Sequence, residues 1–259
     1  MPAPTYNSSY SFTNGWGTLE TTSSTTTATF TVNPDDLIVV FGGQANYDTS
    51  TGIDNIVSIS DNYNLKWTLV SANQNNSFWC PLRCWCAVNT YPTSITITIT
   101  LSLYLASSTT VRFGGKAYTF SNSNGIGFTA NYLENSASDG SYDLAITPYG
   151  GSSLFIFYVL DWSTWDLIDR TYGTNNGLSP TEIDYSQESN YTVVAALYNN
   201  TVDGNLSFLT AQSPKVTAMA IEILGFPFGV GQGVLPPSPI GERTVYNITS
   251  ISKISSIRF

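Results

Sequence analysis

Residues 94–103 read SITITITLSL, in which isoleucine or leucine alternates with threonine or serine. A period of two places one set of side chains on each face of a strand, so we expect the apolar set in a core and the hydroxyl set in water. Short runs rich in β-branched and aromatic residues recur along the chain, separated by clusters of Asn, Asp, Gly, Ser and Pro. No stretch has a sustained helical period with caps at both ends, and residues 182–189 have room for one or two helical turns at most. The pattern predicts an all-β protein, an antiparallel β-sandwich of jelly-roll or immunoglobulin-like type.

The two halves of the sequence also show a weak similarity to each other. Residues 36–41 (DLIVVF) resemble residues 153–158 (SLFIFY), and each half ends in a strand-like stretch, TVRFGGKAYTF or KVTAMAIEILGF. We therefore predict an internally duplicated body over residues 28–226, with halves of about 28–121 and 122–226 forming duplicated sheets of one sandwich.

The two ends of the chain differ from this body. Residues 1–27 are rich in Ser and Thr and predict either a flexible lead-in or another contact arm. Residues 227–243 are rich in Pro and Gly and predict a semi-rigid linker. The last segment, residues 244–259, has apolar residues at intervals of three, which fit neither a strand nor a full helical stripe. It is either an edge strand or frayed end, or an attachment arm that inserts into a neighbouring subunit.

The low and acidic charge of the chain limits the kinds of partner that it can bind. Only 10% of residues are charged, and the formal net charge is −9, so no basic stripe exists to bind a phosphate backbone. No apolar run is long enough to cross a bilayer, and the N-terminal stretch lacks the features of a secretory signal. We expect an extracellular or virion-surface protein that binds no nucleic acid and has no membrane span.

Catalytic chemistry has few candidates. The chain contains no His, which excludes Ser-His-Asp and Cys-His nucleophile systems, and it has no phosphate-binding loop motif. A glycosidase needs a pair of carboxylates beside aromatic side chains. The acidic residues near Trp162 and Trp165 that fit this need are Asp161, Asp166, Asp169, Asp184 and Glu188. Carboxylates that cap turns explain them better, and we expect no catalytic residue and no cofactor.

Cysteines and carboxylates are the candidate metal ligands of this chain. Cys80, Cys84 and Cys86 form one cluster, which is either a set of buried thiols or one disulfide with an odd thiol. A zinc site would need a fourth soft ligand, and the chain has none. Calcium would use Asp48, Asp54 and Asp61, but their spacing matches no known loop, so we expect no metal.

Aromatic and amide side chains make sugar binding the main alternative function. Tryptophans stack on pyranose faces, and the first candidates are Trp79, Trp85, Trp162 and Trp165. The competing interpretation places these rings in the core and at its margins. Asn-x-Ser/Thr sequons are candidate glycosylation sites at Asn7, Asn75, Asn190, Asn199, Asn205 and Asn247.

The order of elements resembles a β-sandwich pattern of phage and viral tail or surface proteins and bacterial cell-surface proteins. The matching segments are residues 34–37, 60–68, 86–88, 93–100 and 118–121. The resemblance covers residues 28–226 and carries no catalytic residues. Asn64 stands where that pattern has Gly, a substitution that a left-handed backbone tolerates. The low-charge composition is similar to that of surface proteins of thermoacidophilic archaeal viruses.

These features predict a structural protein of a virion surface, such as a turret, spike or tail-fibre component. Its expected partners are other virion proteins, a second copy through residues 227–259, and a host surface glycan. The alternatives are a carbohydrate-binding module or adhesin and, less well supported, a glycoside hydrolase.

Overall fold

The protein's structure is a computed structural model whose described part is built entirely from strands and their connections. It describes residues 3–13, 19–20, 22–46, 56–73, 81–104, 111–134, 141–149, 153–161, 170–188, 191–210 and 216–225. The strands of the first half are β1 (Thr5–Ser11), β2 (Leu19–Glu20), β3 (Ser24–Val32), β4 (Leu37–Asn46), β5 (Ile56–Asp61), β6 (Thr68–Asn73), β7 (Leu82–Val88), β8 (Ile95–Tyr104) and β9 (Val111–Ser121). Those of the second half are β10 (Ser123–Glu134), β11 (Ser141–Ile146), β12 (Leu154–Asp161), β13 (Arg170–Tyr172), β14 (Thr181–Glu188), β15 (Tyr191–Asn199), β16 (Gly204–Thr210) and β17 (Val216–Gly225).

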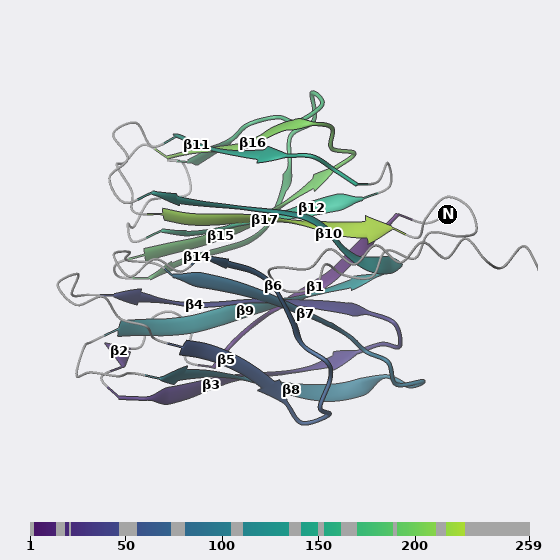
Figure 1. The fold of residues 1–259 in the computed structure, drawn as a ribbon, viewed down its shortest axis with the longest axis vertical. Coiled ribbons are helices and arrows are strands. Elements are labelled where there is room, and N and C mark those ends of the chain that lie inside the picture. The colour runs from purple at the N-terminus through teal and green to yellow at the C-terminus, as the bar shows by residue number, and fades with distance from the viewer. Residues whose placement is uncertain are drawn as a thin grey trace, which may run out of the picture.

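The strands form four antiparallel sheets that are stacked as layers (Figure 1). One outer layer has the order β3-β8-β5, and the sheet beside it has the order β1-β9-β4-β7-β6. The next layer has the order β10-β17-β12-β15-β14, and the other outer layer has the order β11-β16-β13. Each half of the chain is therefore a sandwich of one large and one small sheet, and the two large sheets face each other.

Strand order identifies each sandwich as a jelly roll. Apart from the short β2, the first half pairs its first strand with its last (β1 with β9), its second with its second-last (β3 with β8), and β4 with β7. The second half repeats this nesting with β10 and β17, β11 and β16, and β12 and β15. Nested antiparallel pairing over two sheets is jelly-roll topology. The sequence-based expectation of an antiparallel, internally duplicated sandwich is confirmed, with one correction: the halves are two stacked sandwiches rather than sheets of a single one.

Successive side chains of the central strands point to opposite faces of their sheet, and this produces three apolar layers. In β4, Ile38 and Val40 point into the core of the first sandwich, whereas Val39 and Phe41 point toward the second half. The core of the second sandwich lies between its two sheets and contains Phe155 and Phe157. Because β4 and β12 are buried on both faces, they contain the continuous apolar runs Leu37–Phe41 and Leu154–Leu160.

Glycines let the first sandwich close tightly. Gly42 lies opposite Gly115 in the β4–β9 pair, and Leu101 of the small sheet fills the space above both. A Cβ added at Gly115 would lie 2.4 Å from the Leu101 side chain and 2.8 Å from the carbonyl oxygen of Phe41. Glycine is required here by the close approach of the two sheets.

Two expectations from the sequence differ from the structure. The N-terminal stretch is part of the fold, because β1 pairs with β9 and β3 begins at Ser24, before the body was expected to start. Residues 181–188 form strand β14 rather than helical turns. Residues 227–259 lie outside the described residues.

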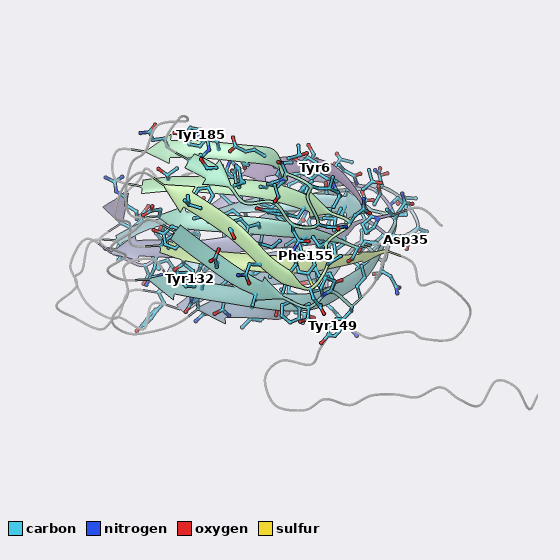
Figure 2. All side chains as sticks on the ribbon, turned by 90° about the horizontal axis from the view of Figure 1, so that it is seen from above. Tyr6, Asp35, Tyr132, Tyr149, Phe155 and Tyr185 are labelled. Carbon is cyan, nitrogen blue, oxygen red and sulfur yellow. The ribbon has the colours of Figure 1, made fainter. Side chains whose placement is uncertain are left out.

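Corresponding strands of the two sandwiches run in the same direction, so the connections between strands gather at two ends of the body. At one end, the side chain of Asn73, the last residue of β6, donates a hydrogen bond to the carbonyl of Tyr132, near the end of β10. The other end, here called the turn end, carries the turns over residues 33–36, 62–67, 89–94, 173–180 and 200–203. It also carries Thr5 and Gly225, which pair with Ser121 and Ser123. In Figure 2, Asp35 marks the turn end, and Tyr132 and Tyr185 lie toward the opposite end.

Candidate functional site at the turn end and its buried supports

The β5–β6 turn is held by one carboxylate. Asp61 accepts hydrogen bonds from the backbone N–H groups of Tyr63 (2.6 Å) and Leu65 (3.1 Å) and from Nε1 of Trp67 (2.7 Å). Asn64 has φ of 58°, the left-handed conformation expected for it. Asp61 therefore fixes a turn, and the two other calcium candidates, Asp48 and Asp54, lie outside the described residues.

A buried asparagine organises the neighbouring turns of the first half. The side-chain amide of Asn89 donates to the carbonyls of Val32 (3.2 Å) and Asn33 (2.9 Å), and its Oδ1 accepts from the N–H of Tyr91 (3.0 Å). The Asn89 side chain is fully buried. It therefore supplies partners to loop backbone groups that would otherwise be unpaired.

Asn175 has the same role in the second half. Its Nδ2 donates to the carbonyls of Val202 (3.2 Å) and Asn205 (3.4 Å), and its Oδ1 accepts from the N–H of Val202 (2.9 Å). The following Asn176 and Gly177 both have positive φ, which these residue types allow. Both sandwiches thus end in rigid, internally bonded turns.

Apolar side chains are exposed on these rigid turns. Tyr149 is 62% exposed, and the other large apolar side chains exposed at the turn end are Val88, Tyr91, Leu178 and Val202. In the described part of the chain, Tyr104 and Leu209 are the large apolar side chains exposed elsewhere. Five of the seven large apolar side chains exposed in the described residues therefore lie at the turn end.

One ion pair joins the two sandwiches from inside. Lys116 of β9 lies 2.9 Å from Oδ2 of Asp184 on β14, and both side chains are about nine-tenths buried. The hydroxyl of Tyr118 donates to the same oxygen at 3.2 Å. Burial, together with the neighbouring Tyr158 and Asp184, raises the pKa of Tyr118 well above its usual value, so this hydroxyl remains a donor. The contact fixes the register of the two large sheets.

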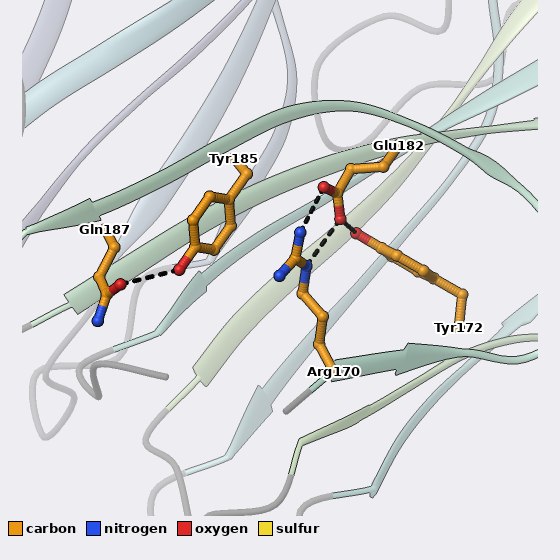
Figure 3. Close-up of polar contacts among 5 residues, drawn as sticks. All are labelled: Arg170, Tyr172, Glu182, Tyr185 and Gln187. Carbon is orange, nitrogen blue, oxygen red and sulfur yellow. Dashed lines mark hydrogen bonds and ion pairs between the residues drawn. The ribbon is translucent and has the colours of Figure 1, made fainter. Parts of the chain in front are cut away.

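A second charged cluster closes the edge of the second sandwich (Figure 3). Nε of Arg170 on β13 donates to Glu182 on β14 at 2.7 Å, a second guanidinium nitrogen bonds the other carboxylate oxygen, and the hydroxyl of Tyr172 donates to Glu182 at 2.6 Å. The guanidinium lies 4.2 Å from the ring centre of Tyr185. Partial burial alone raises the pKa of Glu182, but the bonds from Arg170 and Tyr172 outweigh it and lower the pKa.

A third acidic side chain, that of the buried Glu222, bonds backbone groups. Glu222 on β17 accepts hydrogen bonds from the N–H groups of Phe128 (2.7 Å) and Tyr149 (3.0 Å). A Cβ at Gly127 would lie 2.3 Å from a carboxylate oxygen of Glu222, so a larger residue there would displace this carboxylate. Glu222 thereby ties β10 and the turn that carries Tyr149 to the centre of the sheet.

The tryptophan candidates for sugar binding separate into two groups. Trp85 is 6% exposed and packs in the core of the first sandwich, so it has no free ring face and is not a sugar platform. Trp79, Trp162 and Trp165 lie outside the described residues. The strand ends that flank them, at β6, β7, β12 and β13, are all at the end opposite the turn end.

The carboxylates considered for glycoside hydrolysis do not form a pair in the described residues. Asp161 is fully buried and follows the alternation of Phe157 and Val159 toward the small sheet. Asp184 points toward the first sandwich, where it binds Lys116. Asp166 and Asp169 lie outside the described residues, and β15 separates β12 from β14, which ends at Glu188. No group of three or more potential metal ligands occurs within the described ranges.

Cysteines and sequons are placed as follows. Cys84 and Cys86 are free, buried thiols on β7, and Cys80 lies outside the described residues. Burial raises the pKa of Cys86 to about 12.

Among the sequons, Asn7, Asn199 and Asn205 are exposed, whereas Asn75, Asn190 and Asn247 lie outside the described residues. Asn7 Oδ1 accepts a hydrogen bond from the Ser121 hydroxyl (2.9 Å).

Comparison with protein-family models, with curated proteins and with solved structures finds no match to this chain. None of the described segments is a helix able to cross a membrane. Function is therefore inferred from the geometry alone.

Proposed function

We propose that this chain is a structural protein of a virion surface, a turret, spike or tail-fibre component that is anchored through its turn end and displays the opposite end. The observation that carries this proposal is the set of apolar side chains exposed on the rigid turns, including Tyr149, Leu178 and Val202. Gly225, the last described residue, lies at that same end. The expected linker, residues 227–243, and the expected attachment arm, residues 244–259, follow it in the sequence.

The interior of the body supports a load-carrying role. The two sandwiches share an apolar layer from both large sheets, and the Lys116–Asp184 pair adds a polar contact across it. A large apolar interface between halves disfavours hinge motion. The carboxyl groups of the partly buried Glu182 and the buried Glu222 bind partners within the body.

The mass in solution tests this proposal. Light scattering would compare the full chain with a version ending at Phe226 and with the full-length double variant Leu178→Ser, Val202→Ser. We expect a trimer or larger assembly that falls to monomer on truncation and is weakened by the double variant. Monomers in all three cases would overturn self-assembly through this end and direct the search to a different partner protein.

A second candidate function is binding of a surface glycan at the opposite end. The strand ends that flank Trp79, Trp162 and Trp165 gather there, so the segments that contain these residues begin and end in one region. Aromatic rings with nearby amides and hydroxyls are the usual components of sugar sites. A glycan array probed with the full chain tests this role. Saturable binding that is lost in Trp162→Ala and Trp165→Ala would support it, whereas equal binding by these variants would contradict it.

A further inference from the structure

Sheet edges in this protein are protected to different degrees. An edge strand presents unpaired N–H and C=O groups, which proteins commonly shield with charges, prolines, bulges, short strands or a covering segment. Most edges here have such protection. Bulges or register shifts interrupt the edge strands β1, β6, β10 and β14. The edge strand β11 contains the charged residue Asp143. The other two edge strands are short: β13 has only 3 residues and includes Arg170, and β5 has 6 residues and ends at Asp61.

Strand β3 is the exception among the described edges. It has 9 residues (STTTATFTV), none of them charged or proline. It pairs with β8 without a bulge from Ser24, opposite Leu103, to Val32, opposite Ile95. This long, regular and neutral edge has the features of a template for another strand.

Thr13 contacts the middle of this edge, and the ring of Tyr10 stacks on the ring of Phe30 nearby, with centroids 4.0 Å apart. The N–H of Thr13 donates to the carbonyl of Thr27 (2.8 Å), and the N–H of Thr27 donates to Oγ1 of Thr13 (3.3 Å). Both backbone groups of Thr27 therefore point away from β8. Because this direction alternates along a strand, the backbone groups of Thr29 and Thr31 point outward as well. Both threonine side chains are exposed, and within the described ranges no backbone hydrogen bond outside the strand pairs involves Thr29 or Thr31.

We infer that this open edge pairs with the same edge of a second copy, antiparallel and centred on Phe30. Thr29 of one copy then lies opposite Thr31 of the other, and each outward N–H and C=O of these residues finds a partner. The segment suits self-pairing because it lacks charge in a protein of net charge −9, where charged edges of two copies would repel each other. A two-fold axis closes the contact at a dimer.

The pairing would also continue a pattern on the sheet's outer face. Oγ1 of Thr29 lies 2.9 Å from Oγ1 of Thr98, and Thr31 lies opposite Thr96. A second copy extends these neutral hydroxyl rows without placing a charge beside them. The contact is small compared with a stable interface, so it adds to other contacts in an assembly rather than replacing them. It does not depend on the attachment role proposed for the turn end.

Register-specific cross-linking tests the inference in the full chain. In a Cys80→Ser background, chains carrying Thr29→Cys are mixed with chains carrying Thr31→Cys under mild oxidation. Opposed residues of a hydrogen-bonded antiparallel pair have Cα atoms about 5.5 Å apart, within disulfide reach. We expect a disulfide-linked dimer from this mixture and a several-fold lower yield from Thr25→Cys mixed with Thr31→Cys, a pair out of register.

A second measurement guards against effects of the new cysteines. Lysine at an edge blocks strand pairing, so Thr31→Lys should reduce the concentration-dependent mass of the full chain in sedimentation equilibrium. Thr96→Lys, in the same row but on the central strand β8, should leave it unchanged. Equal cross-linking in the matched and shifted mixtures would overturn the inference, as would equal masses for the two lysine variants. Because both measurements keep residues 226–259, loss of edge pairing is distinguishable from loss of arm-mediated assembly.

Discussion

Phe41 and Tyr158 stack face to face between the two sandwiches, with ring centroids 4.2 Å apart and planes inclined by 2°. They are the last residues of the two segments that echo each other, residues 36–41 and 153–158, and they lie on the corresponding strands β4 and β12. Equivalent positions meet in this way near the two-fold axis of a symmetric dimer. The two halves of the chain therefore pack as two subunits of such a dimer would.

Truncating this contact should weaken the whole body. Phe41→Ala removes a fully buried ring that also contacts Tyr118, and we expect the free energy of unfolding to fall by about 3–5 kcal/mol. Phe41→Leu keeps most of the volume and should cost about 1.5 kcal/mol or less. Urea unfolding measured by fluorescence checks both. An Ala variant as stable as the Leu variant would show that the sheets do not pack at Phe41.

The glycine pair opposite Leu101 allows a sharper test of packing. The three atoms nearest to an added Cβ at Gly42 belong to side chains, the closest being Leu101 at 2.9 Å, whereas a Cβ at Gly115 also lies 2.8 Å from the Phe41 carbonyl oxygen. Each should destabilise by about 1–3 kcal/mol. Adding Leu101→Val should recover part of the loss in Gly42→Ala but little in Gly115→Ala, because the backbone oxygen remains. Thermal unfolding of the four variants gives the comparison, and equal recovery would contradict the assigned contacts.

The fold was largely predictable because strands of the outer sheets, such as β8, alternate apolar and polar residues. Residues 94–103 predict one buried and one exposed face, and Ile97 and Thr96 take those positions in β8. The stacking of two sandwiches was not predictable, because a run such as Leu37–Phe41 reads the same whether its second face meets a sheet of its own sandwich or another one. Edge strand β14 was missed because its polar residues, Glu182 and Asp184 among them, bind partners that are distant in sequence.

The supports of the candidate site were only partly visible in the sequence. Asp61 and Asn64 belong to a recognisable turn pattern, and both take the expected local roles. Lys116 and Glu222 are isolated charges inside apolar strands, which signals a buried partner without naming it. Their partners, Asp184 and the backbone of Phe128, come from other strands, and only the topology brings them together.

Stability in acid should depend on Glu182. Its pKa is lowered in the folded state, so it contributes stability above the unfolded value of about 4.3, and that stability is lost as the pH falls through the folded pKa. Glu182→Gln should therefore lose less stability than the parent between about pH 5 and pH 3. Urea midpoints across that range provide the measurement.

Asp36 serves as a control, because its pKa is shifted in the direction opposite to that of Glu182. Burial raises its pKa, despite bonds from Asn33, so its contribution is present at low pH and lost as the pH rises through the folded pKa. Asp36→Asn should make the decline in acid steeper than in the parent protein. If Glu182→Gln and Asp36→Asn change the acid profile in the same direction, the charge contacts assigned to Glu182 are wrong.

The two described cysteines should be unreactive while the protein is folded. Burial raises the pKa of both Cys84 and Cys86, that of Cys86 to about 12, and the thiolate is the reactive form. In a Cys80→Ser variant, a thiol reagent at about pH 8 should label neither residue in the native state and both in denaturant. Labelling of the denatured, unreduced wild-type chain then reports on Cys80. Three reactive thiols would show that the chain has no disulfide. One reactive thiol would show that two cysteines form a disulfide, which would contradict the free state of Cys84 and Cys86.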